Sequence, residues 1–380
     1  MKSKHWLILF FVLLFTGMAG YMAINYRVNP LGYFTVEKGT DYYQPDQYVR
    51  AIKSKYIARN DDQIDAVIIG GSKAGALNTE LLTKYTGKNY YNFYFNVGNF
   101  SDYQTYIEYL VGHSYVSEIT LHLSSFEIDN FKAGSSSTMQ VPAIVSGNIW
   151  DRVTETLSYL LTDIQTLKKN YKKIIKWDVE TLDLTAVGEK NRVSHYRKFA
   201  ADPDGYTEKN VTKNLNSYLK KMFKQAASTR PAYDDNLNAL RKIKKLCDEN
   251  NITLKVVIGA SFIGERDTYE CNRYYAYLKE LVSITDVWDF SSFSDINLNP
   301  YNFINRKHYN TAVGDLMINT MYGKDSYDGF GIYLTQDNID DYLKQRKADF
   351  ERLKEEFETT GTIALPGMED DSYIAAVETQ

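Results

Sequence analysis

The sequence predicts an α/β protein in which a mostly parallel, five-stranded sheet lies between two layers of helices. Short apolar runs bounded by turn residues alternate with segments of helical periodicity, which is the pattern of parallel strands joined by helical crossovers. Two further observations extend this prediction. A long apolar segment opens the chain, and residues 131–230 interrupt the alternation. We therefore expect an N-terminal transmembrane helix and a helical insertion.

The amino terminus combines basic residues with a continuous apolar segment. Lys2 and Lys4 precede Trp6 to Ile24, and about 19 helical residues at 1.5 Å each span roughly the hydrocarbon core of a bilayer. Under the positive-inside rule the lysines stay in the cytoplasm and the main domain lies outside the cell. A signal peptide cleaved near Gly17 to Gly20 is the alternative. Because the apolar run continues through Met22 to Ile24, we favour an uncleaved anchor.

The alternation of strands and helices begins at about Asp65. Asn78 is an expected helix cap, and Asp235 is another. A charged helix over Asn338 to Glu358 is expected to have a solvated face. The five expected strands are Asp65 to Gly70, Tyr91 to Val97, Glu118 to Leu123, Ile252 to Ile258, and Asp286 to Phe290; further helices are expected over Asp102 to Val111 and Glu270 to Ile284.

These elements define an expected domain organisation. Residues 1–28 form the cytoplasmic tip and anchor, and residues 29–62 form a membrane-proximal segment. Residues 63–130 and 231–325 build the α/β domain. Between them, residues 131–230 form an inserted cap with a long helix from Trp150 to Lys176, and residues 326–380 add a C-terminal helix and tail.

Composition limits the classes of function. Of the 380 residues, 44% are hydrophobic and 24% charged, which is typical of a globular protein. The net charge of −4 gives no reason to expect nucleic acid or anionic lipid as a partner. The two cysteines, Cys247 and Cys271, do not have a metal-ligand spacing, so no metal site is expected. They either form one disulfide or remain two buried thiols.

Ser72 is the first candidate site residue. It follows an apolar strand and two glycines, in Val67-Ile68-Ile69-Gly70-Gly71-Ser72-Lys73-Ala74. This arrangement places the serine at the carboxyl edge of a parallel sheet, where ligands bind in open α/β folds. The amide of Ser72, near a helix amino terminus, is also a candidate donor to an oxyanion. An ordinary turn with a capping serine would have the same sequence.

His308 is the second candidate. It follows the last expected strand by a loop, with Asn305 three residues before it. A serine hydroxyl needs a base to remove its proton, so Ser72 and His308 together supply the minimum for acyl transfer. In a doubly wound sheet both residues reach the same edge. We expect His113 and His122 to be structural, and His195 has no partner motif.

A second oxyanion donor is expected after the second strand. Asn92 and the run Asn96-Val97-Gly98-Asn99 follow or end that strand. The backbone amide of Gly98 would complete an oxyanion hole with that of Ser72. Asparagine and glycine are also plain turn residues.

These residues together resemble a known family. The chain is similar to SGNH (GDSL-like) hydrolases, and in particular to the DltD-like, membrane-anchored, extracellular proteins of Gram-positive bacteria that are encoded beside membrane-bound O-acyltransferases. The matching features are the anchor, Asn29 to Phe34, Ile68 to Ala74, Tyr91 to Gly98, Ile119 to Leu123, and Asn305 to Tyr309 with Gly314. The resemblance implies a three-layer, SGNH/flavodoxin-like sandwich.

The sequence departs from the family pattern at two places. The family usually has an aspartate three residues before the histidine, whereas this chain has Asn305. Secreted esterases of the family have an asparagine in the region where this chain has Leu121 to Ser124. An amide can orient an imidazole but cannot stabilise its cation by charge, and loss of the carboxylate in a serine triad costs about four orders of magnitude in rate. Asp289 or Asp295 is therefore an alternative partner of the histidine.

The resemblance implies an acyltransferase that needs no cofactor. Ser72 would accept an acyl group, of acetyl or D-alanyl type, from an integral membrane O-acyltransferase. His308 would then help to transfer it to a cell-surface polysaccharide or teichoic acid. Two alternatives remain open: a membrane-tethered carbohydrate or lipid esterase with the same site, and a non-catalytic scaffold with the same fold.

Overall fold

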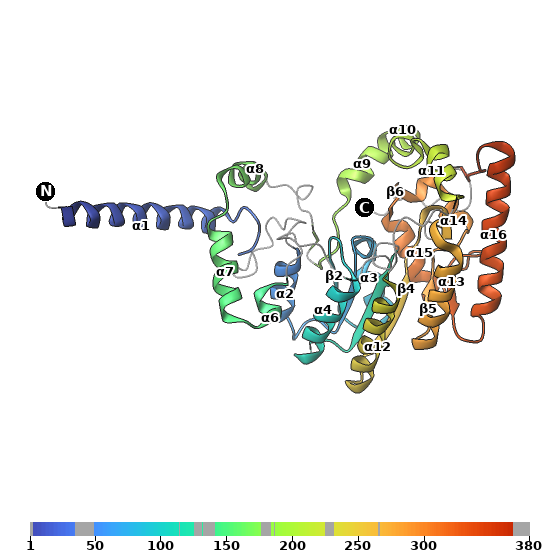
Figure 1. The fold of residues 1–380 in the computed structure, drawn as a ribbon, viewed down its shortest axis with the longest axis horizontal. Helices are drawn as coiled ribbons and strands as arrows, with labels where there is room; N and C mark the ends of the chain where they lie inside the picture. Colours follow the sequence, from blue (N-terminus) through green and yellow to red (C-terminus); the bar gives the residue numbers. More distant parts are fainter. Residues whose placement is uncertain are drawn as a thin grey trace. The chain divides into compact units, whose positions relative to one another are not determined.

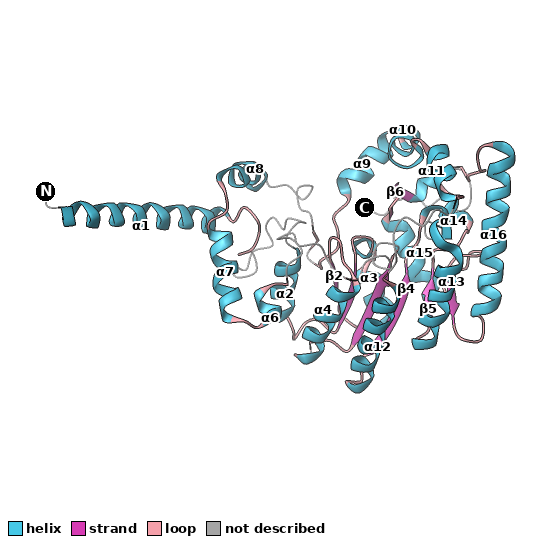
Figure 2. Ribbon diagram, viewed as in Figure 1, coloured by secondary structure: helices cyan, strands magenta, loops and turns pink. Residues whose placement is uncertain are grey.

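The computed structural model describes residues 3–34, 49–113, 115–124, 131, 141–175, 184–185, 187–224, 232–264 and 267–367. The protein has an α/β fold with a mostly parallel sheet and an apolar N-terminal helix, as Figure 1 and Figure 2 show. The expected tail beyond residue 367 lies outside the described residues.

The sheet has six strands in the order β2-β1-β3-β4-β5-β8. The first five pair in parallel, and β8 pairs with β5 in the antiparallel direction. Every residue of the three strands β1, β2 and β3 is buried, because helices or loops cover both faces of this part of the sheet. The strands are β1 (Ala66–Gly70), β2 (Tyr90–Tyr94), β3 (Glu118–Leu123), β4 (Thr253–Ile258), β5 (Val287–Asp289) and β8 (Ile332–Leu334).

All five expected strands are confirmed as parallel members of this sheet. The expected number of strands is wrong by one, since β8 adds an antiparallel edge. This strand has three residues, with Val287 opposite Leu334 and Asp289 opposite Ile332. So short a strand has no periodic pattern that distinguishes it from a loop.

The helices of this α/β unit follow the expected positions. Asn78 caps α3 by accepting a hydrogen bond from the amide of Leu81, whereas Asp235 lies inside the first turn of α12 and does not cap it. Four of these helices pack in series: α4 against α12, α12 against α13, and α13 against α16. Helix α15 packs against α3. These helices are α3 (Thr79–Thr86), α4 (Phe100–Gly112), α12 (Tyr233–Glu249), α13 (Asp267–Ile284), α15 (Thr311–Met321) and α16 (Ile339–Thr360).

The chain divides into two compact units, and this division corrects the expected insertion. One unit contains Met1–Arg59 and Ser135–Ala186, and the other contains Asn60–Gly134 and Val187–Gln380. Residues 131–230 therefore do not form a single cap. Their first half joins residues 1–59, and their second half belongs to the α/β unit. That second half holds α9 (Val193–Ala201), α10 (Pro203–Thr207), η5 (Glu208–Thr212) and α11 (Leu215–Met222).

The smaller unit begins with α1 (Ser3–Val28), which is long and apolar enough to cross a membrane over Lys4–Val28. A signal sequence would share these properties. The unit continues with α2 (Val49–Arg59), α6 (Ala143–Ser146), α7 (Ile149–Leu160) and α8 (Ile164–Ile175).

The single long helix expected over Trp150 to Lys176 is broken at Leu161 to Asp163. Asp163 causes the break, because its side chain accepts hydrogen bonds from the amides of Gln165 and Thr166, both at 2.9 Å, and so starts a new helix.

Candidate active site

Ser72 lies in the turn that follows β1, the strand between β2 and β3. The chain leaves β1 toward β2 on one side and later returns to β3 on the other, so Ser72 lies at the switch point of the sheet, where open α/β folds bind ligands. Gly70 ends the strand in a crowded position: a Cβ there would lie 2.7 Å from the carbonyl oxygen of His122 and 2.8 Å from the Cβ of Ala74. A glycine is therefore required for the chain to turn toward Ser72 at this point.

Asn92 holds the segment that follows Ser72. From the buried strand β2, its Nδ2 donates to the carbonyl oxygens of Ala74 at 2.9 Å and Leu77 at 3.1 Å. These carbonyls belong to or follow the short helix η2 (Ala74–Ala76), directly after the serine turn. Asn92, which sequence analysis placed near the oxyanion hole, thus has a structural role in fixing this turn.

His308 and Asn305 lie on a small antiparallel hairpin formed by β6 (Phe303–Asn305) and β7 (His308–Tyr309). The hairpin brings both residues to Ser72. His308 Nε2 lies 2.8 Å from Ser72 Oγ, and His308 Nδ1 lies 3.0 Å from Asn305 Oδ1. All three expected catalytic residues therefore form one hydrogen-bonded chain, although 236 positions separate the serine from the histidine.

The orientation of the Asn305 amide determines which tautomer the imidazole adopts. The backbone amide of Lys307 donates to Asn305 Oδ1 at 3.0 Å, so this atom is the carbonyl oxygen of the side chain. His308 must then donate from Nδ1, which leaves Nε2 as an acceptor for the Ser72 hydroxyl. A neutral histidine in this tautomer is suited to act as a general base toward the serine.

The second half of the expected insertion supports the hairpin. The hydroxyl of Tyr206 donates to the carbonyl of Ile304 at 3.2 Å, and Arg306 Nε donates to the carbonyl of Val211 at 2.6 Å. The Tyr196 hydroxyl also exchanges hydrogen bonds of 2.8 Å with the amide and the hydroxyl of Thr311. These contacts hold the residues on either side of His308 from two directions.

Arg192 is a member of the site that sequence analysis missed. It is 3% exposed, and its Nη1 donates to the carbonyl of Tyr309 at 2.8 Å, while Nη2 lies 3.5 Å from the carbonyl of Ser72. It thus connects the serine turn with the histidine hairpin. Among the described residues, no carboxylate forms an ion pair with Arg192. A single arginine between Asn191 and Val193 carries no sequence signal for this position.

Burial and positive charge keep His308 neutral. Removal from water is the largest effect, followed by the charges of Arg192, Lys73, Lys190 and Lys307, and together they lower the pKa of His308 to about 3. The imidazole is therefore an unprotonated base at neutral pH. The same charges oppose the imidazolium that a serine mechanism forms, and Asn305 supplies no charge to offset them.

Two backbone amides are available as oxyanion donors. The loop after β2 begins beside the serine turn, because the amide of Phe95 donates to the carbonyl of Gly70 at 2.8 Å. In the described part of the chain, neither the Ser72 amide nor the Gly98 amide donates to an acceptor. Gly98 is buried against Tyr103, and Val97 before it has a φ of +56°, which is strained for a β-branched residue. The amide of Gly98 thus remains a candidate donor.

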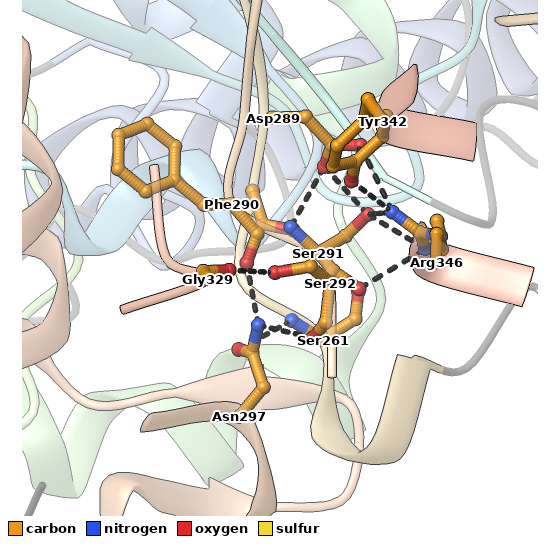
Figure 3. Close-up of polar contacts among 10 residues, drawn as sticks. Ser261, Asp289, Phe290, Ser291, Ser292, Asn297, Gly329, Tyr342 and Arg346 are labelled. Carbon is orange, nitrogen blue, oxygen red and sulfur yellow. Dashed lines mark hydrogen bonds and ion pairs between the residues drawn. The ribbon is translucent and has the colours of Figure 1, made fainter. Parts of the chain in front are cut away.

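Asp289 is not the partner of His308, which corrects one alternative. It forms a buried ion pair with Arg346 at 2.9 Å, accepts from the Tyr342 hydroxyl at 2.8 Å, and accepts from the amide of Ser291 at 2.7 Å (Figure 3). Neither charged side chain is accessible to solvent.

Asp295, the other alternative, is exposed in the first turn of α14 (Asp295–Leu298), and no described contact joins it to His308. Asn305 occupies the partner position.

The Asp289 network instead fixes the loop that leads from β5 toward the histidine hairpin. Asn297, in the same network, donates from Nδ2 to the carbonyls of Phe290 and Ser292, and its Oδ1 accepts from the amide of Ser261 (Figure 3). The hydroxyl of Ser261 in turn accepts from Lys73 Nζ at 3.4 Å. The residue beside the nucleophile is therefore tied to the loop that precedes the base.

The remaining histidines occupy other positions. His122 is fully buried in β3, its Nε2 lies 3.0 Å from the Tyr309 hydroxyl, and burial followed by the charge of Lys73 lowers its pKa to about 3. His113 Nδ1 contacts the carbonyl of Tyr109 at 2.8 Å, and His195 Nδ1 contacts the Tyr206 hydroxyl at 3.0 Å. The described residues contain no group of three or more metal-ligating side chains. Cys247 is a buried free thiol.

Comparisons with known proteins do not assign the chain to a family. No protein-family model matches it, and neither the curated proteins nor the solved structures contain a significant match.

Proposed function

We propose that this protein is a serine-dependent O-acyltransferase that acts at the outer face of the membrane on a cell-surface polysaccharide or teichoic acid. The observation that carries the proposal is the hydrogen-bonded chain from Ser72 through His308 to Asn305 at the carboxyl edge of the sheet. This geometry is that of a nucleophile, its base and a group that orients the base. The proposed fold is a three-layer, SGNH/flavodoxin-like sandwich. The order β2-β1-β3-β4-β5 of the parallel strands is consistent with this fold.

In the proposed first step, Ser72 Oγ attacks the carbonyl carbon of an acyl ester or thioester. The proton of the serine passes to His308 Nε2, and the amides of Ser72 and Gly98 donate to the oxyanion. The bond to the leaving group then breaks, the leaving group takes the proton from His308, and the acyl group remains on Ser72 as an ester.

In the second step, a hydroxyl of the polymer attacks the same carbonyl. His308 takes the proton of this hydroxyl, the new ester bond forms, and Ser72 leaves with the proton returned from His308. No cofactor takes part. Asn305 orients the imidazole during both steps but contributes no charge, so the intrinsic rate is expected to be low compared with a triad that contains aspartate.

The location of the reaction follows from α1 in this proposal. If α1 remains as an anchor, Lys2 and Lys4 hold its amino terminus in the cytoplasm and the α/β unit is outside the cell. Activated acyl groups are made in the cytoplasm, so an integral membrane O-acyltransferase is the proposed partner that delivers them to Ser72. External protease should then digest the α/β unit on intact protoplasts, and full protection of that unit would contradict the proposed topology.

An esterase with the same residues is the second candidate. Ser72 and His308 are both only partly buried, which would allow water to take the place of the polymer hydroxyl. Rapid hydrolysis of p-nitrophenyl acetate by the purified protein, with no transfer to polymer, would favour the esterase.

The test of the proposal is the acyl content of the surface polymer in strains that carry Ser72→Ala. This change removes one hydroxyl, so the protein should fold while polymer acylation is lost. Ser283→Ala, at an exposed position of α13, is the matched control and should retain acylation. Normal acylation with Ser72→Ala would reject the enzymatic proposal and favour a scaffold that recruits the acyltransferase.

A further inference from the structure

Helix α7 carries a stripe of apolar side chains that is exposed and does not pack against its own unit. Its apolar residues recur every four positions, at Ile149, Val153 and Leu157, and the series continues to Leu161 just after the helix. All four are exposed, and the neighbouring Trp150 is 72% exposed. A helix in a globular protein normally turns such a stripe toward the core. No residue of α7 is buried.

Other residues of α7 contact the rest of its unit: Tyr159 and Leu160 pack against the cluster of Tyr33, Phe34 and Ala51, and polar side chains form hydrogen bonds. Glu155 accepts a hydrogen bond from the amide of Ala143 at 2.6 Å, and Asp151 accepts one from the hydroxyl of Ser146 at 2.8 Å. Both acids line a cavity of about 730 Å³ together with Arg50. The helix thus directs acids and hydroxyls inward and its aliphatic stripe outward, as expected for a helix whose outer surroundings are lipid.

The connection between α7 and α8 is fastened to the membrane-length helix α1 (Figure 1). The carbonyl of Thr162, in this connection, accepts hydrogen bonds from the Tyr21 hydroxyl at 2.5 Å and from Asn25 Nδ2 at 3.3 Å. From Trp6, where the apolar segment begins, Tyr21 and Asn25 lie about 23 and 29 Å along the helix at 1.5 Å per residue. A hydrocarbon core of about 30 Å that starts at Trp6 would therefore end near Asn25.

These distances place Thr162 at the membrane boundary whenever α1 spans the bilayer. Leu161 and Ile164, which lie on either side of Thr162 in the sequence, are both exposed. Helix α7 ends at Leu160 and α8 begins at Ile164, so these two helix ends, each two residues from Thr162, cannot lie far above the lipid.

Helix α8 has the composition of a helix at a lipid surface. Ile164, Leu167 and Tyr171 recur at intervals of three and four residues, and Ile164 and Tyr171 are exposed. Lys168 and Lys169 are exposed beside them, and the helix sequence also contains Lys172 and Lys173. Amphipathic helices rich in lysine bind at the interface of membranes that contain anionic lipids.

We propose that α7 and the start of α8 lie in the headgroup region of the outer leaflet, with the stripe Ile149, Val153, Leu157 and Leu161 and the side chain of Trp150 inserted among the acyl chains. The lipid surface is the proposed partner because the stripe is continuous with a helix that the bilayer itself surrounds. This inference rests on the proposed anchoring by α1 and does not depend on the chemistry of Ser72. It would hold the smaller unit at a fixed depth at the membrane.

The depth of Trp150 tests this proposal. The full-length protein with Trp150 as its only tryptophan (Trp6→Phe, Trp177→Phe, Trp288→Phe) is reconstituted without other proteins into vesicles of phosphatidylglycerol and phosphatidylcholine. In one sample the phosphatidylcholine carries bromine on its acyl chains. We expect Trp150 emission to be at least twofold weaker in the brominated vesicles.

Two double variants in the same background separate the polarity of the stripe from the effect of substitution itself. Val153→Glu with Leu157→Glu should abolish the quenching, because two carboxylates oppose insertion of the stripe. Val153→Leu with Leu157→Ile keeps the same two positions apolar and should retain it. Neither side chain is buried, so the fold should be unaffected.

Flotation of the vesicles distinguishes failure of the anchor from failure of the inference. Protein that does not float with vesicles would overturn both proposals. Protein that floats while Trp150 is not quenched would overturn the placement of α7 and leave the anchor standing. Quenching that appears only after addition of an integral acyltransferase would also overturn it, since a protein partner would then be needed.

Discussion

Replacement of Asn305 by aspartate is expected to accelerate ester turnover. Asn305 Oδ1 lies 3.0 Å from His308 Nδ1, so Asn305→Asp would place a carboxylate oxygen against the imidazole without moving the backbone. An opposite charge within about 4–6 Å raises the pKa of a histidine by roughly 1–3 units. The imidazolium formed in the transition state would be stabilised by the same interaction.

The magnitude follows from this shift. Each pKa unit corresponds to about 1.4 kcal/mol and hence to about tenfold in rate, so a 10- to 1000-fold increase is expected. Two unit charges about 4 Å apart at an effective dielectric constant of about 20 interact by ~4 kcal/mol, which agrees with the upper limit.

The assay is hydrolysis of p-nitrophenyl acetate by the purified full-length protein, measured as kcat/KM. Asn238→Asp, at an exposed position of α12, adds the same charge away from the site and should change nothing. If Asn305→Asp leaves both the turnover and the pKa of His308 unchanged, the assigned role of this side chain is wrong. A folded variant with a raised histidine pKa but no gain in turnover would favour a scaffold.

Three further predictions concern the surroundings of the site. Because burial and nearby cations lower the pKa of His308 to about 3, activity should persist well below pH 6.5. Arg192→Met removes one of these cations and should move the acid limb of the kcat/KM profile upward toward pH 6.5. An unmoved limb would contradict the electrostatic role of Arg192. Asp289→Asn leaves its buried arginine partner without a counterion and should lower the free energy of unfolding in urea by about 3–5 kcal/mol. Because Asp289 reaches the site only through the loop after β5, turnover per folded molecule should fall far less than with His308→Ala, and an equally large loss would return this aspartate to the triad. Gly259→Ala would place a methyl group in collision with His122 Nε2 and should lower the thermal midpoint, whereas an unaltered midpoint would mean that the ring moves freely.

The sheet was predictable from sequence because its strands are buried on both faces. The run Ala66–Gly70 is apolar throughout, and Glu118–Leu123 has an apolar residue at every second position; turn residues bound both runs. The three-residue strand β8 was not predictable, because only its pairing with β5 distinguishes it from a loop. The division of the insertion depended on long-range contacts in the same way.

The candidate triad was predictable because each member lies in a local pattern. Ser72 follows a strand and two glycines, and Asn305 and His308 have a fixed spacing on one hairpin. Arg192 was not predictable, since its position depends on how residues 187–224 pack over the hairpin. The choice between Asn305 and Asp289 also required the structure, because the side chain of Arg346 that neutralises Asp289 comes from a helix 57 residues away.

The most direct measurement of the central claim is the acyl state of Ser72. The protein would be isolated from cells that also carry an integral membrane O-acyltransferase, and digested at acidic pH to preserve esters. The peptide that contains Ser72 would then be analysed by mass spectrometry. We predict an acyl adduct on Ser72 that is absent from Ser72→Ala and accumulates when the polymer acceptor is depleted. Normal polymer acylation in the wild-type strain, without an adduct on Ser72 even when the acceptor is depleted, would contradict the account.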